Sequence, residues 1–273
     1  MKKLSGFLQI IAVGIILSAV ISSCGERGGD RSRRAITDNR ERRAQEMVSP
    51  EEYPIPTSVE VVEMLHRAGA PYTLGISNSP ANADRYFTEK SKALNLGVYG
   101  ADLSYAAIYE MNTETRRYLQ VSRQLIDELN ISTTFNQQFA QRVENNINNT
   151  DSLIHIVSDS FYDTYDFLTR QRRDDLSLLV MTGSWIEGMY ITSQIALGAR
   201  DNREITDIIL QQDEPLEILL SLMQEIDGDF DDLYDDLADI HDYIKDLQSP
   251  LSDRELENFA GRIEELRNRI VQA

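Results

Sequence analysis

Apolar residues recur at steps of three and four along nearly the whole chain after residue 57, and no segment shows the strict alternation of a half-buried strand. This spacing places apolar side chains on one face of successive α-helices. The clearest stripes are Phe230, Leu233, Leu237, Ile240, Ile244 and Leu247, and then Leu256, Phe259, Ile263, Leu266 and Ile270. Because a short segment with Pro250 separates them, the stripes predict a C-terminal antiparallel helical hairpin. The expected fold class is an all-α, multi-helix bundle.

The segment from Asp174 to Leu197 predicts the central helix of this bundle. Between Leu176 and Ile191 nearly every residue is apolar or small, so a helix here has no polar face. Such a helix is normally buried on all sides. A membrane-spanning helix is the alternative, but Glu187 in the middle of the segment favours burial within protein.

Breaks in the pattern divide the rest of the domain into further elements. We expect a short helix capped by Thr57 or Ser58, a loop over 71–80, and a helix over 82–96 that Gly97 ends. One long helix is expected over 101–129, followed by helices over 135–147 and 151–168. Two shorter helices are expected over 202–210 and 215–226. A capping box of Ser252 and Glu255 predicts the start of the last helix.

The first 24 residues have the order of a secretion signal. Lys2 and Lys3 are basic, residues 7–21 are largely apolar, and Ile21-Ser22-Ser23-Cys24 follows. The apolar stretch is shorter than the roughly 20 residues that a membrane-spanning helix needs. This order predicts an exported protein.

The last four of these residues resemble the lipobox of bacterial lipoproteins, in which an aliphatic and two small residues precede a cysteine. The resemblance implies that residues 1–23 are a signal peptide and that Cys24 becomes the acylated first residue, carrying fatty acids such as palmitate. Cys24 is the only cysteine, so no intramolecular disulfide is possible. Several acyl chains on one residue make a durable membrane anchor. The alternatives are an uncleaved anchor and a signal peptide cut without lipid.

Residues 24–56 are predicted to be a lipidated N-terminus and flexible tether, and residues 57–273 an α-helical domain. The tether has almost no large apolar residue before residue 44, so it cannot bury enough surface to order itself. No acidic cluster follows Cys24 of the kind that resembles a surface-export signal. The expected location is therefore the cell envelope, at the periplasmic face of the outer membrane.

The charge of the chain changes sign between tether and domain. Residues 24–46 hold seven arginines and five acidic residues, whereas the chain from Met47 onward holds 18 basic and 40 acidic residues. The arginines can contribute about 1 kcal/mol each near anionic headgroups, or the tether can be a plain solvated spacer. Nucleic acid is excluded as a partner, because so acidic a domain lacks the basic patches that phosphate binding requires.

Glu187 is the first candidate for a functional residue in the domain. A carboxylate within an apolar helix is costly unless it is paired or protonated. One interpretation is a structural pair with an arginine or tyrosine across the bundle, for example from the run 115–118. The other is a ligand pocket formed by Trp185, Glu187 and Tyr190.

A second candidate is an acidic surface at Asp229, Asp231, Asp232, Asp235 and Asp236. The segment resembles a calcium loop only superficially, because the sixth position is Asp232 in place of glycine and the twelfth is Ala238 in place of glutamate. The leucines between the aspartates fall at core spacing, which favours the solvated face of a helix. Docking of a basic partner, or loose binding of divalent cations, is the alternative.

Motifs for catalysis, cofactors or metals are missing from the sequence. One Glu-x-x-His spacing occurs, at Glu63 and His66, whereas a di-iron bundle needs it twice. We therefore expect no cofactor, no metal and no enzyme. The expected function is a membrane-anchored scaffold or interaction module that binds an envelope protein, and the alternative is a small-ligand sensor. In style the domain resembles helical lipoproteins of Gram-negative bacteria such as the Bacteroidota.

Overall fold

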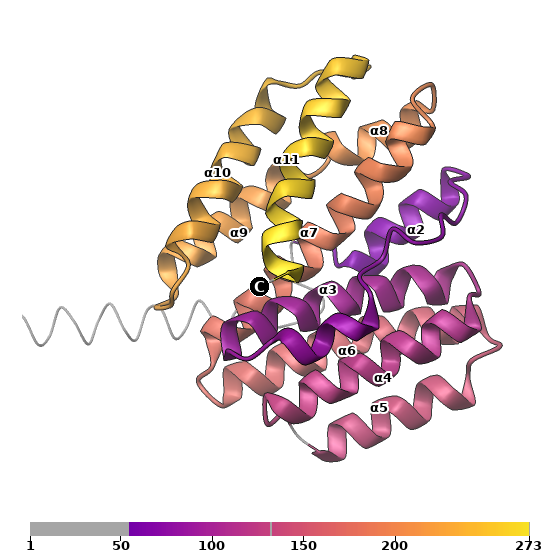
Figure 1. The fold of residues 1–273 in the computed structure, drawn as a ribbon, viewed down its shortest axis with the longest axis vertical. Helices are drawn as coiled ribbons and strands as arrows, with labels where there is room; N and C mark the ends of the chain where they lie inside the picture. Colours follow the sequence, from indigo (N-terminus) through magenta and orange to yellow (C-terminus); the bar gives the residue numbers. More distant parts are fainter. Residues whose placement is uncertain (1–54, 132, 273) are drawn as a thin grey trace, which may run out of the picture. The chain divides into compact units, whose positions relative to one another are not determined.

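The structure is a computed structural model that describes residues 55–131 and 133–272. Within these ranges the chain forms ten α-helices, one 3₁₀ helix and no strand, which confirms the predicted all-α bundle (Figure 1). The elements are α2 (Ser58–Arg67), η1 (Pro80–Arg85), α3 (Glu89–Ile108), α4 (Asn112–Glu128), α5 (Thr133–Asn145), α6 (Thr150–Arg170), α7 (Asp174–Gly198), α8 (Arg203–Leu210), α9 (Asp213–Glu225), α10 (Asp231–Asp246) and α11 (Asp253–Val271). The predicted signal peptide, Cys24 and nearly all of the tether lie outside the described residues.

Helix α7 is the central helix, as its sequence predicts. Its residues from Leu176 to Ile191 are almost all buried. It packs most extensively against α3, next against α11, and also against α2, α6, α8 and α9. None of the helices in the described ranges combines the length and apolarity that crossing a membrane requires.

Two glycines let α3 and α7 approach each other closely. A Cβ atom placed on Gly97 would lie 1.9 Å from the carbonyl oxygen of Val180, and one placed on Gly183 would lie 1.9 Å from that of Leu94. The prediction that Gly97 ends a helix is therefore wrong: Gly97 lies inside α3, where it makes room for the backbone of α7. The contact is reciprocal, since each helix supplies one glycine opposite the backbone of the other.

The single long helix predicted over 101–129 is also wrong. Helix α3 ends at Ile108, and α4 begins at Asn112. Between them Glu110 adopts a left-handed conformation (φ 59°), Met111 N–H donates to the carbonyl of Ala106, and Glu110 N–H donates to that of Ala107. These two bonds are those of a Schellman cap. The sequence does not predict this helix end, because glutamate occupies the left-handed position where glycine is usual.

The predicted C-terminal hairpin is present. Helices α10 and α11 pack against each other, and α11 packs more extensively against α7. The capping box that was predicted to start the last helix is formed: Ser252 N–H donates to Glu255 Oε2 at 2.7 Å, and Glu255 N–H donates to Ser252 Oγ at 3.3 Å. The hairpin is thus attached to the bundle core through α11.

Candidate functional site

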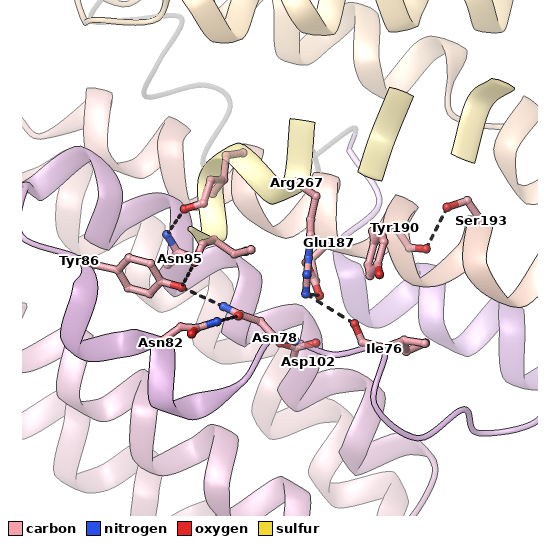
Figure 2. Close-up of polar contacts among 12 residues, drawn as sticks. Ile76, Asn78, Asn82, Tyr86, Asn95, Asp102, Glu187, Tyr190, Ser193 and Arg267 are labelled. Carbon is pink, nitrogen blue, oxygen red and sulfur yellow. Dashed lines mark hydrogen bonds and ion pairs between the residues drawn. The ribbon is translucent and has the colours of Figure 1, made fainter. Parts of the chain in front are cut away.

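A network of buried polar side chains surrounds Glu187 of α7. Its side chain is 0% exposed and accepts two hydrogen bonds from Arg267 of α11, from Nε to Oε2 at 2.8 Å and from Nη2 to Oε1 at 2.9 Å (Figure 2). This two-pronged geometry is the strongest form of an arginine–carboxylate pair. The expectation of a structural partner for Glu187 is met, but not by an arginine from 115–118: Arg116 and Arg117 are exposed.

Arg267 connects this pair to two further parts of the domain. Its Nη2 also donates to the carbonyl of Ile76 at 3.5 Å, and its guanidinium lies 4.4 Å from the ring centre of Tyr190. Burial alone would lower the pKa of Arg267, but its hydrogen bonds and charge attraction to Glu187 raise that pKa overall. Arg267 is therefore charged and joins α11, α7 and the loop that contains Ile76.

Asp102 of α3 is the second buried acid of the network. It is 0% exposed, and its Oδ2 accepts a hydrogen bond from Asn78 N–H at 3.0 Å. Its other oxygen, Oδ1, is buried without a hydrogen-bond partner, and Glu187 lies close enough for the two acids to interact. Burial raises the pKa of Asp102 well above its usual range, and the negative charge of Glu187 adds to that rise. Nothing in the periodicity of α3 marked Asp102 as a member of a site with Glu187.

A polar stripe along α3 holds the loop over residues 69–79. Tyr99 Oη donates to the carbonyl of Ser79 and Tyr109 Oη to that of Ala70, while Tyr105 Oη accepts from Thr73 N–H, each at 2.8 Å. Residues 99, 102, 105 and 109 share one face of a helix because their steps are three and four. This segment, predicted as a loop over 71–80, is thus attached at four points to α3 and its C-cap residue Tyr109, one of them being Asp102.

The C-terminal end of α11 is held in a similar way. The last carbonyl groups of a helix have no partner within the helix. Here Tyr86 Oη donates to the carbonyl of Val271 at 3.2 Å, and Asn95 Nδ2 donates to that of Ile270 at 3.0 Å (Figure 2). Side chains from α3 and from the segment before it therefore cap α11.

Trp185 lies apart from Glu187 and Tyr190. Its indole N–H donates to Gln212 Oε1 at 3.2 Å, and its ring borders a largely apolar cavity of about 40 Å³ beside Phe161 and Val180. Side chains two positions apart on a helix, such as those of Trp185 and Glu187, point in directions that differ by about 200°. The predicted pocket of Trp185, Glu187 and Tyr190 is therefore not formed: Glu187 and Tyr190 contact Arg267, while Trp185 faces another neighbour.

The predicted acidic surface lies along the start of α10. Asp231, Asp232 and Asp235 are exposed, Asp229 pairs with Lys90 at 3.1 Å, and Asp236 pairs with Arg269. Across the described ranges, no group of three or more histidine, cysteine or acidic side chains is arranged to hold a metal ion. The ring of His66 packs edge-on against Tyr109, with 5.1 Å between ring centres. The aspartates at the start of α10 therefore form a solvated face that contains two ion pairs, Asp229 with Lys90 and Asp236 with Arg269.

A groove runs beside this acidic face. It has a volume of about 320 Å³ and lies between the start of α3, the start of α10 and the end of α11. Its apolar residues are Leu94, Leu233, Leu266 and Ile270, and its charged residues are Lys90, Asp232, Asp236 and Arg269. Phe87, directly before the groove residue Thr88, is 83% exposed. Sequence reasoning missed this groove because three distant segments form it.

Comparisons of the chain with known protein families, with curated proteins and with solved structures found no match. A functional assignment therefore depends on the residues themselves. The network around Glu187 contacts other parts of the same domain, whereas the groove beside α10 combines a charged rim with an apolar floor whose residues are mostly buried.

Proposed function

We propose that this protein is a lipid-anchored, non-enzymatic docking module of the cell envelope, held at the periplasmic face of the outer membrane. The single observation that carries the proposal is Ile21-Ser22-Ser23-Cys24 directly after a basic start and an apolar segment. Acylation of Cys24 would attach the chain to a bilayer. Residues 25–56 would then separate the helical domain from the membrane.

The groove beside α10 supports docking as the task of the domain. Phe87 is exposed and directly precedes the groove residue Thr88 in the chain, and aromatic residues carry a large share of binding energy at interfaces. The rim carries two basic side chains, Lys90 and Arg269, and two acidic ones, Asp232 and Asp236. The exposed Asp231 and Asp235 on the neighbouring face make the local charge negative, which favours a basic partner. The partner that fits is an envelope protein with a segment that combines an apolar anchor and basic residues.

A small-ligand sensor built on the predicted pocket of Trp185, Glu187 and Tyr190 has less support. Pockets for drug-sized ligands have volumes of about 300–1,000 Å³ and a few convergent polar groups. The cavity beside Trp185 has about 40 Å³ and is lined mainly by apolar side chains. Glu187, which was expected to supply the polar contact, is paired with Arg267.

The anchor is tested by the variant Cys24→Ser in a Gram-negative host fed an alkyne-tagged fatty acid. We expect the parent chain to take up the label and enter the detergent phase, and the variant to lose nearly all of both signals. Ser23→Ala is the matched control, because it keeps a small residue before the cysteine and should be labelled like the parent. Equal labelling of the Cys24→Ser variant and the parent would show that Cys24 is not the site of a lipid anchor.

Docking is tested by photo-crosslinking in living cells. A crosslinking side chain at Phe87 should form an adduct with one discrete envelope protein, and the added change of Asp232→Lys should strongly reduce its yield by charge repulsion. Leu74 is the matched control position, because it is also a large apolar residue and is 74% exposed, on the 69–79 loop. Docking at the groove is refuted by equal adducts from both positions, or by none from Phe87.

A further inference from the structure

The network holds two buried acids and one buried cation. The side chains of Asp102 and Glu187 are 0% exposed, and that of Arg267 is 9% exposed. Both prongs of Arg267 bind Glu187. A second ionised carboxylate next to this pair would be a buried charge without a counterion, which is strongly unfavourable.

Apart from Arg267, whose guanidinium is bound to Glu187, the groups that face Asp102 supply no positive charge. Helix α7 contributes Glu187 and Tyr190, α11 contributes Arg267, and the 69–79 loop contributes Ser77, Asn78 and Tyr72. Tyr99 of α3 and Tyr118 of α4 complete the set. Burial raises the pKa of each of these tyrosines, to about 12 for Tyr72, so they stay neutral near pH 7.

We infer that Asp102 keeps its proton in the folded protein and donates it in a hydrogen bond to Glu187, and that this proton is a latch that keeps α11 and the 69–79 loop on α3 and α7. Asp102 Oδ1 is buried without a hydrogen-bond partner, and two neighbouring carboxyl groups attract each other only when one of them carries a proton. Asp102 is the one to carry it, because Glu187 already accepts two hydrogen bonds from a cation.

Loss of the proton would place a second negative charge beside Glu187. Arg267 would then be shared between two acids, and its contacts with Glu187 and with the carbonyl of Ile76 would weaken. The same loop is bound to Asp102 through Asn78 N–H. The 69–79 loop and the end of α11 are therefore the parts that we expect to loosen first.

The direction of the pH effect follows from linkage. Burial, and then Glu187, raise the pKa of Asp102 in the folded state above its unfolded value of about 4. The folded state therefore binds more protons than the unfolded state in the interval between the two pKa values. The stability that the latch contributes is fully present below pH ~4 and is lost as the pH rises toward the folded-state pKa.

The variant Asp102→Asn tests this in the full chain, because an amide can accept from Asn78 and donate to Glu187 without ionising. We measure hydrogen exchange of residues 69–79 and of α11 from about pH 5 to pH 9, as the ratio of the parent to the variant. In the pH range where the folded parent binds the extra proton, its opening should increase by about tenfold per pH unit relative to the variant. Asp232→Asn, on the exposed acidic face, should behave like the parent.

A ratio that does not change with pH would overturn the inference, as would a variant less stable than the parent throughout this range. The infrared spectrum of the parent chain provides an independent test if the variant does not fold. A band from a protonated carboxyl group should persist near pH 7, and its absence would also overturn the inference. Neither measurement depends on membrane anchoring or on a docking partner.

Discussion

Replacing Arg267 with methionine should lower the free energy of unfolding by about 3–5 kcal/mol, the range for breaking a buried ion pair by removing one partner. The change leaves Glu187 and Asp102 buried together with no cation, and it removes the donor to the carbonyl of Ile76. Methionine keeps most of the packing volume of the arginine side chain, so the loss reports mainly on charge and hydrogen bonding. Urea unfolding followed by circular dichroism measures the effect.

Arg269→Met is the matched control for this variant. Arg269 lies on the same helix and pairs with Asp236, but its side chain is 54% exposed. Exposed ion pairs contribute about 0–1 kcal/mol, so the control should unfold close to the parent. Adding Glu187→Leu to Arg267→Met should restore part of the loss, since it removes the unpaired acid. Equal losses for the two arginine variants would show that Arg267 is not a buried partner.

Alanine at Gly97 or Gly183 should also be severely destabilising. Each new methyl group would lie 1.9 Å from a backbone carbonyl oxygen, so α3 and α7 would have to move apart along the most extensive helix contact in the described domain. Overpacking costs about 1–3 kcal/mol, and we expect the upper end because a backbone cannot move aside like a flexible side chain. Thermal unfolding of the two variants measures the loss.

Gly261→Ala is the control for both glycine variants. Gly261 lies in α11, and an added Cβ would meet no atom within 4 Å. Alanine in a helix interior is more stable than glycine by about 0.5–1 kcal/mol, so this variant should be slightly stabilised. A loss at Gly97 or Gly183 no larger than the change at Gly261 would contradict the close contact of α3 with α7.

Regular periodicity made much of the fold predictable. The stripes from Phe230 to Ile270 and the run of mostly apolar or small residues around Trp185 are local signals, and they correctly predicted the hairpin and the central helix. The predicted helix ends were wrong where glycine, the usual signal for a helix end, was missing or was present for another reason. Glu110 ends α3 without glycine, and Gly97 serves packing between helices where it was expected to end one.

The candidate site was less predictable because its contacts join distant residues. Glu187 stood out in the sequence, but its partner lies 80 positions further along the chain. Among several arginines at helical spacing, no local feature distinguishes Arg267 from Arg262 or Arg269, which are exposed. The separation of Trp185 from Glu187 follows from helix geometry alone, since neighbours two apart point nearly opposite ways.

The bonds that hold the end of α11 also bear on the order in which the domain can be completed. Arg267 donates to the carbonyl of Ile76, which lies 191 positions earlier in the chain. Tyr86 and Asn95 donate to the carbonyls of Val271 and Ile270, which are among the last residues to be synthesised. A polypeptide that leaves a ribosome or a translocation channel from its N-terminus presents α3 and α7 long before α11. Until α11 emerges, Glu187 lacks its cation, so we expect this part of the domain interior to close only when the last residues of the chain are available.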